Sequence, residues 1–141
     1  MRYSQQVLAR VRAPRFVGAL PKDDANVGTG EAGSLDGGTL SRISIRVDPQ
    51  SRRIGEARFK VFGCSAAIAS ASLVTEQLQN SSIDQARGLS PGAVAASLAL
   101  PAERLYAAAL AVEAAQRAVD DWEGKASRSE GRPLPNDGPR T

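Results

Sequence analysis

Two runs of alternating apolar and polar residues, joined by a short polar turn, constrain the fold of this chain more than any other feature. The first run is Leu40–Val47, in which the alternation from Arg42 onward has the period of a half-buried strand. The second run is Ile54–Phe62, with one face formed by Ala57, Phe59 and Val61 and the other by Arg58 and Lys60. Two such runs with so short a connection predict an antiparallel hairpin.

Helical signals lie on both sides of the hairpin. Ser4 is a candidate N-cap for a short helix that Pro14 ends. Ser82 and the Ser90–Pro91 pair resemble the starts of two further short helices. After Gly63, apolar residues recur at steps of three and four, as in a helix that lies on a sheet: Ala67, Ala71, Val74 and Leu78.

The longest periodic segment follows Pro101 and predicts a long helix with a core-facing stripe of Leu105, Ala108, Val112, Ala115, Val119 and Trp122. The order of the segments predicts an α+β domain with helices packed on one face of a small antiparallel sheet. Aromatic residues make up only 4% of the chain, so the core must be built mainly from Ala, Val, Leu and Ile. With 141 residues there is room for one domain, which we place at 1–123. Residues 124–141 contain almost no apolar residue and predict a disordered tail.

The segment from Gly18 to Gly38 is rich in glycine and aspartate, and we interpret it as a mobile surface loop. Its glycines suggest a phosphate cradle, but no GK[ST] follows and no strand-to-helix transition surrounds them. The acidic residues of this segment are Asp23, Asp24, Glu31 and Asp36. Their carboxylates either hold iron loosely or simply keep a solvated loop extended.

Absent residue types exclude several classes of function. The chain has no histidine, which removes His-based catalytic triads, zinc sites and haem ligation. Its net charge is +3, but the arginines are scattered with little aromatic interleaving, so we predict no nucleic-acid partner. A single cysteine excludes an internal disulfide, and no apolar run approaches the roughly 20 residues of a membrane span. We therefore expect a cytoplasmic protein without a membrane partner.

The only cysteine, Cys64, lies directly after Gly63 and before a predicted helix. The free N–H groups and the positive end of the helix dipole favour a thiolate at such a position. Free cysteine also often behaves as a small buried apolar residue. Position alone leaves both interpretations open.

Five segments resemble, in order and spacing, blocks of the NifU/IscU-type iron–sulfur cluster assembly scaffolds: "YSQQVL", "APRFVG", "DANVGTGEAG", "ARFKVFGCSAAIASASLVTEQL" and "LALPAERL". The fourth, around Cys64, is the most specific. The resemblance implies a three-stranded sheet with packed helices and a site at one end where three cysteines converge with an aspartate or histidine. It also implies assembly of a [2Fe–2S] cluster from iron and from sulfur delivered by a cysteine desulfurase.

Most of the implied ligand set is missing from this chain. The first family cysteine falls on Gly37, and the family aspartate falls on Thr39. The second cysteine is Cys64, and the family His–Cys pair falls on Tyr106 and Ala107. The family's Pro-Val-Lys motif for chaperone recognition is not kept either.

Cys64 and Asp36 are therefore the candidate metal ligands, and Cys64 is also the candidate cluster-binding residue. A [2Fe–2S] cluster needs four protein ligands, normally thiolates, and carboxylates bind such centres less well. Two copies in a homodimer would still offer only two thiolates. We expect no stable cluster on this chain alone.

The resemblance thus predicts a non-enzymatic accessory protein of iron–sulfur cluster assembly, whose partner is a cysteine desulfurase or a complete scaffold. The alternative hypothesis is an interaction or regulatory module that kept the scaffold fold and lost the metal chemistry. A thiol enzyme is a third hypothesis, but no histidine exists to take the proton from Cys64.

Overall fold

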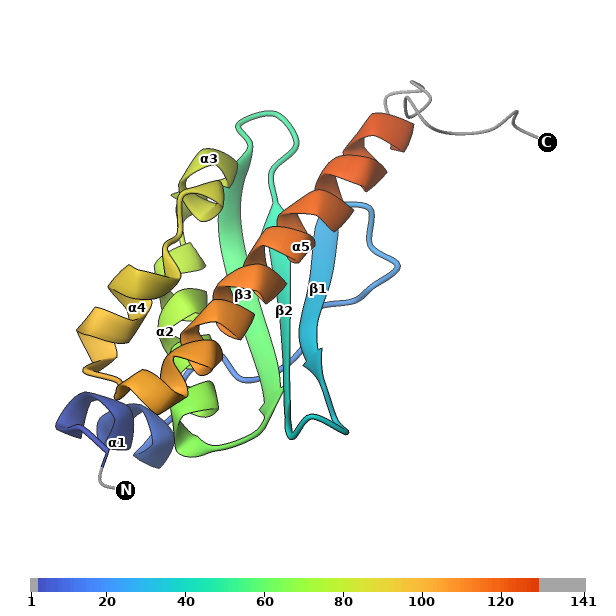
Figure 1. The fold of residues 1–141 in the computed structure, drawn as a ribbon. Helices are drawn as coiled ribbons and strands as arrows, with labels where there is room; N and C mark the ends of the chain where they lie inside the picture. Colours follow the sequence, from blue (N-terminus) through green and yellow to red (C-terminus); the bar gives the residue numbers. More distant parts are fainter. Residues whose placement is uncertain (1–2, 130–141) are drawn as a thin grey trace.

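The computed structural model describes residues 3–129 and shows an antiparallel sheet covered by helices (Figure 1). The strands follow the order β1-β2-β3-β4 across the sheet. The elements, in chain order, are α1 (Gln5–Arg12), β1 (Val27–Ser34), β2 (Thr39–Val47), β3 (Arg53–Phe62), α2 (Ser65–Leu78), β4 (Ser81–Ser82), α3 (Ile83–Arg87), α4 (Pro91–Leu98), the short 3₁₀ helix η1 (Ala102–Arg104) and α5 (Leu105–Ser129). The predicted α+β class and the antiparallel sheet are confirmed.

The central hairpin is formed by β2 and β3, as the alternating pattern predicts. Ile43 lies opposite Phe59, and Ile45 lies opposite Ala57, with all four side chains buried. The neighbouring positions, such as Ser44 opposite Arg58, belong to the other face of the sheet. The apolar face of the hairpin therefore forms the sheet side of the hydrophobic core.

The sheet has four strands rather than the three that the resemblance implies. The added strand, β4, pairs only with Arg53 and Ile54. The strand β1 occupies much of the segment that we interpreted as a mobile loop, and that interpretation is wrong for residues 27–34. A Cβ added to Gly28 or Gly30 would overlap the backbone of α5. These glycines therefore allow the helix to approach β1 closely, and they are not a sign of a flexible segment.

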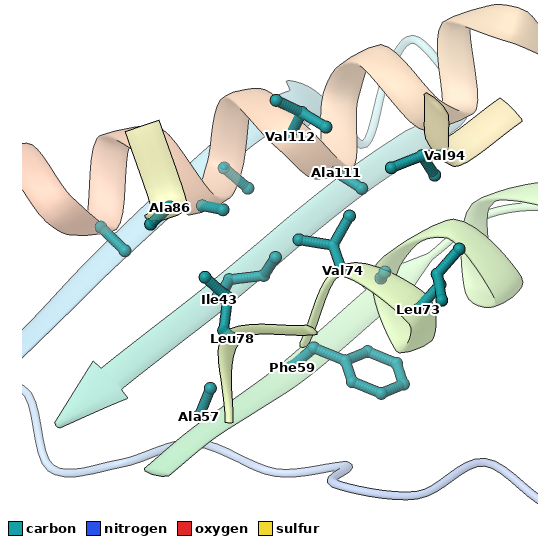
Figure 2. Packing of buried hydrophobic residues seen from close by; sticks show 14 of the residues in the cluster. Ile43, Ala57, Phe59, Leu73, Val74, Leu78, Ala86, Val94, Ala111 and Val112 are labelled. Carbon is teal, nitrogen blue, oxygen red and sulfur yellow. The ribbon is translucent and has the colours of Figure 1, made fainter. Parts of the chain in front are cut away.

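The core lies between one face of the sheet and the helices α2, α4 and α5 (Figure 2). Ile43 of β2 and Phe59 of β3 belong to the same buried cluster as Val74 of α2 and Ala111 of α5. Many of the buried residues of α2 and α5 are alanines, which allow the helices to pack close to the strands. The core is aliphatic, as the low aromatic content predicts, with Trp122 and Phe59 as its largest buried side chains.

The predicted helix starts are confirmed at three serines. The Oγ atom of Ser4 accepts the Val7 N–H at 3.2 Å at the start of α1. Ser82 forms a reciprocal capping box at α3, and Ser90 caps α4, which has a proline in its first turn. These local capping signals position the short helices that connect β4 to α5.

The last helix continues beyond the boundary that we placed at residue 123. It reaches Ser129, the last described residue, so the predicted disorder is wrong for residues 124–129, and the rest of the predicted tail, residues 130–141, lies outside the described residues. The added turns are held because the Lys125 ammonium donates to backbone oxygens of Lys22, Asp24 and Val27. Within residues 3–129, no helix combines the length and the apolar character needed to cross a membrane.

Candidate functional site at the Cys64 end

The site lies at the end of the sheet where the β1–β2 turn, the β3–α2 connection and the start of α5 meet, at the lower side of Figure 1. Gly63 carries the chain from β3 into α2 with a φ of +156°. A Cβ at this position would press on Ala67 and Thr39. The glycine therefore allows a tight turn that places the next residue, Cys64, beside the start of β2.

Cys64 is the N-cap residue of α2, as its position in the sequence predicts. Its side chain makes no capping hydrogen bond, but it is partly buried and its Sγ atom lies 3.5 Å from the Tyr106 Oη atom. Partial burial opposes ionisation of the thiol. The Tyr106 phenol and the nearby N–H groups of Ala67 and Ala66 outweigh this effect and lower the pKa of Cys64. The surroundings of the sulfur thus stabilise its ionised form more than a wholly apolar pocket would.

Tyr106 stands in the first turn of α5 and is 44% exposed. Its hydrogen bond with Cys64 raises the pKa of the phenol, since the bond is strongest when the phenol keeps its proton and the sulfur is ionised. Close by, the Arg104 Nε atom donates to the Tyr3 Oη atom at 3.3 Å. The Tyr3 bond, aided by the negative charge of nearby groups, raises the pKa of Arg104. A fixed cation therefore lies next to the Cys64–Tyr106 pair.

One side of Cys64 packs against a small apolar cluster. Ala66, Ala67 and Ala107 are fully buried, and Cys64 packs against them together with Tyr3. Ala107 is the position on which a family cysteine falls in the resemblance. In this chain the Ala107 methyl group occupies the position of that family cysteine. It makes an apolar contact where the resemblance implies a thiol.

The structure brings several of the predicted positions together at this end. Cys64, Tyr106, Ala107 and Thr39 share this end of the molecule. Asp36 lies exposed on the β1–β2 turn, and its role as a metal ligand stays a prediction. Within residues 3–129, no three Cys, Asp or Glu side chains lie close enough together to hold a metal ion. This donor set does not fit a [2Fe–2S] cluster bound by one chain.

Sequence reasoning did not assign Tyr3 and Arg104 to this site. They lie 101 residues apart in the chain, and each belongs to a segment without a recognisable motif for thiol chemistry. No local signal identifies such a pair. Only the packing of α1 and η1 at the same end of the sheet brings them to Cys64.

The sequence profile of the NifU-like N-terminal domain matches residues 2–129. The chain belongs to this family. It is 38% identical over 125 residues to the iron–sulfur cluster assembly scaffold protein IscU of Haemophilus influenzae, a match that covers 89% of this chain and 98% of that protein. It is 39% identical over 125 residues to the mitochondrial iron sulfur cluster assembly protein 1 of Debaryomyces hansenii, covering 89% of this chain and 70% of that protein.

The fold of this NifU-like domain is also found among solved structures. A crystal structure described as an iron–sulfur cluster assembly scaffold protein for the SUF system, from Fervidobacterium islandicum AW-1, matches with a TM-score of 0.58 and 15% identity. The match covers 83% of this chain and 96% of that one. At this identity the likeness concerns the fold alone.

Proposed function

We propose that this NifU-like protein takes part in iron–sulfur cluster assembly as an accessory member of the family, which offers one reactive thiol and does not hold a cluster by itself. The observation that carries the proposal is the composition of the Cys64 end. Cys64 lies there with Thr39, Tyr106 and Ala107, three positions to which the family resemblance assigns ligands, and Cys64 is the only sulfur among the four. The names of the relatives support the assembly role.

The proposed chemistry is acceptance of a sulfur atom from a cysteine persulfide of a desulfurase. The Cys64 thiolate attacks the outer sulfur of the persulfide and forms a new S–S bond. The old S–S bond breaks, and its electron pair leaves with the sulfur of the donor cysteine as a thiolate. The proton of the incoming persulfide stays with the transferred sulfur, so neither an oxidant nor a reductant is needed.

The residues around Cys64 support this step. The N–H groups of Ala66 and Ala67 and the phenol of Tyr106 stabilise the attacking thiolate. The exposed side chain of Phe62, at the end of β3, and that of Tyr106 give this end an apolar rim that a protein partner can cover. The role is that of a stoichiometric acceptor, so we propose no enzymatic turnover. It requires a compartment where thiols stay reduced, such as the cytoplasm.

The first experiment measures iron and acid-labile sulfide in protein purified without oxygen, before and after reconstitution with iron, sulfide and a desulfurase. We expect far less than one [2Fe–2S] cluster per chain, because the described residues supply too few ligands. A monomer with a stable cluster bound only by its own side chains would contradict the accessory role.

The second experiment tests the thiol. After incubation with a desulfurase and cysteine, intact-mass analysis should show one added sulfur atom on the wild-type chain and none on Cys64→Ser. Ser65→Ala, a change at the next position, is the control and should still accept sulfur. If Cys64→Ser supports cluster assembly in a mixture with a complete scaffold as well as the wild type does, the alternative of a binding module without thiol chemistry is correct.

A further inference from the structure

The last turns of α5 are fastened to the segment before β1 through the ammonium group of Lys125. Its Nζ atom donates to three backbone oxygens, those of Lys22 at 2.5 Å, Asp24 at 3.2 Å and Val27 at 2.8 Å. The side chain of Lys125 is only 19% exposed. A lysine ammonium has three N–H donors, so these oxygens use all of them. We call residues 22–27 the carbonyl loop.

The carbonyl loop has the form of a cation site. Each carbonyl oxygen carries partial negative charge, so three of them converge only around a positive group or a hydrogen-bond donor. Backbone carbonyls arranged in this way replace the hydration shell of potassium ions in channel filters. Here the positive group at the point of convergence belongs to the chain itself.

Internal bonds hold the carbonyl loop in shape without the help of Lys125. The Asp24 carboxylate accepts the Asn26 N–H at 2.8 Å and binds the Arg46 guanidinium at 2.6 Å. The Asp24 backbone oxygen also accepts the Val27 N–H at 3.1 Å. The turn is therefore fixed at both ends, and its oxygens are held near one another by bonds that do not involve α5.

Further oxygen atoms lie beside the ammonium. Asp121, one helical turn before Lys125, has its Oδ2 atom 3.9 Å from the Nζ atom, and the same oxygen accepts the Thr29 N–H at 2.9 Å. Lys125, Asp121 and Thr29 line one hollow of about 380 Å³. The Thr29 Oγ1 atom is buried and has no hydrogen-bond partner within residues 3–129. An unpartnered hydroxyl oxygen in such a place is a free ligand for a cation.

The charge and spacing of these oxygens favour a monovalent ion over a divalent one. Calcium takes six to eight oxygens at about 2.3–2.6 Å, commonly with several carboxylates. Here the carbonyl oxygens are neutral, and Asp121 supplies the one carboxylate near the ammonium. Two of the three N···O distances, to Asp24 and Val27, exceed the calcium range. A potassium ion carries the same charge as an ammonium group and is close to it in size.

We propose that the carbonyl loop is a binding site for a potassium-sized monovalent cation, which the Lys125 ammonium fills from within the chain. The end of α5 and a dissolved ion then compete for the same three oxygens. The tethered ammonium excludes the ion from the wild type. The site becomes available to potassium when the ammonium is withdrawn.

The test compares Lys125→Ala with Lys125→Met. Both variants remove the ammonium and keep a good helix former, but only alanine leaves room for an ion, since methionine places an apolar side chain in the hollow. Chemical denaturation is measured in potassium chloride and in choline chloride at equal ionic strength. At a potassium concentration ten times the Kd, the folding equilibrium constant of Lys125→Ala should be about tenfold higher than in choline chloride. Lys125→Met and the wild type should have the same constant in both salts.

Crystals grown with rubidium chloride, a heavier substitute for potassium, show where the ion binds. The anomalous signal of Lys125→Ala should contain a peak in contact with the backbone oxygens of Lys22, Asp24 and Val27. The crystals of Lys125→Met should contain none at this place. Stabilisation of Lys125→Ala by potassium without a peak at the carbonyl loop would overturn the proposed site.

The proposal is also wrong if potassium chloride stabilises Lys125→Ala no more than it stabilises Lys125→Met. If Lys125→Ala is unfolded in choline chloride, the measurement is its refolding after exchange into potassium chloride. Recovery of the folded state there supports the site, and a chain that stays unfolded in both salts contradicts it.

Discussion

At the scale of single residues, Cys64 gains its character from neighbours that are distant in the sequence. Its place at the N-cap of α2 was predictable from the glycine and the helical pattern that surround it. Its contact with Tyr106 was not, because 42 residues separate the two side chains. The sequence therefore left the thiol open between a reactive and a structural role, and the tertiary contacts add that its pKa is lowered.

Tyr106→Phe should raise the pKa of Cys64, because it removes a hydrogen bond that stabilises the thiolate. A bond worth about 1 kcal/mol corresponds to a roughly fivefold slower alkylation by iodoacetamide near neutral pH. The measurement is the rate of alkylation between pH 6 and pH 10. The rates of the wild type and of Tyr106→Phe should become equal at high pH, where both thiols are ionised.

Tyr3→Phe is the matched control for this experiment. Tyr3 also favours the thiolate, but its contribution is smaller than that of Tyr106. It should therefore slow alkylation less. An unchanged pH profile in Tyr106→Phe would show that the phenol does not set the state of the sulfur.

At the scale of elements, the hairpin and the helix starts were predictable because their signals are local. Alternation identifies β2 and β3, and capping serines identify α1, α3 and α4. The strand β1 was missed because its glycines resemble a loop when only neighbouring residues are considered. Glycine is needed at these positions because the backbone of α5, more than 80 residues further along the chain, leaves no room for a Cβ atom.

Gly30→Ala should destabilise the fold by about 1 to 3 kcal/mol, because its Cβ would overlap backbone atoms of α5 and force the helix away from β1. Chemical denaturation measures the free energy of unfolding. Gly55→Ala is the control, since it lies in β3 with open space around its Cα atom, and should change stability by less than about 0.5 kcal/mol. Equal effects at both positions would contradict the close-approach explanation.

At the scale of the whole molecule, one ionic cluster joins three parts of the fold at the end opposite Cys64. Glu123 of α5 binds Arg52 of the β2–β3 turn and Arg87 of α3. The Arg52 guanidinium also lies over the Trp122 ring, 5.4 Å from its centre. Partial burial opposes ionisation of Glu123, but the bonds to Arg52 and Arg87 outweigh it and lower the pKa of the carboxyl.

Glu123→Gln should lower the free energy of unfolding at pH 7 by about 1 kcal/mol, a modest value because the cluster is partly exposed to solvent. The folded-state pKa lies below the ordinary value of 4.5, so the stabilisation is complete above that pH. It is lost as the pH falls through the folded-state pKa. Denaturation curves of the two proteins should therefore differ at pH 7 and approach each other in acid. A difference that persists in acid would mean that charge is not the cause.

The contact between β1 and α5 also affects the order in which the molecule folds. Thr29 and Asp121 are 92 residues apart, so closing this contact carries the loop entropy of most of the chain. On the ribosome, β1 emerges long before the helix against which it fits. We expect the β1 edge of the nascent sheet to stay exposed until synthesis of α5 is complete. The docking of that helix should be among the last steps of folding.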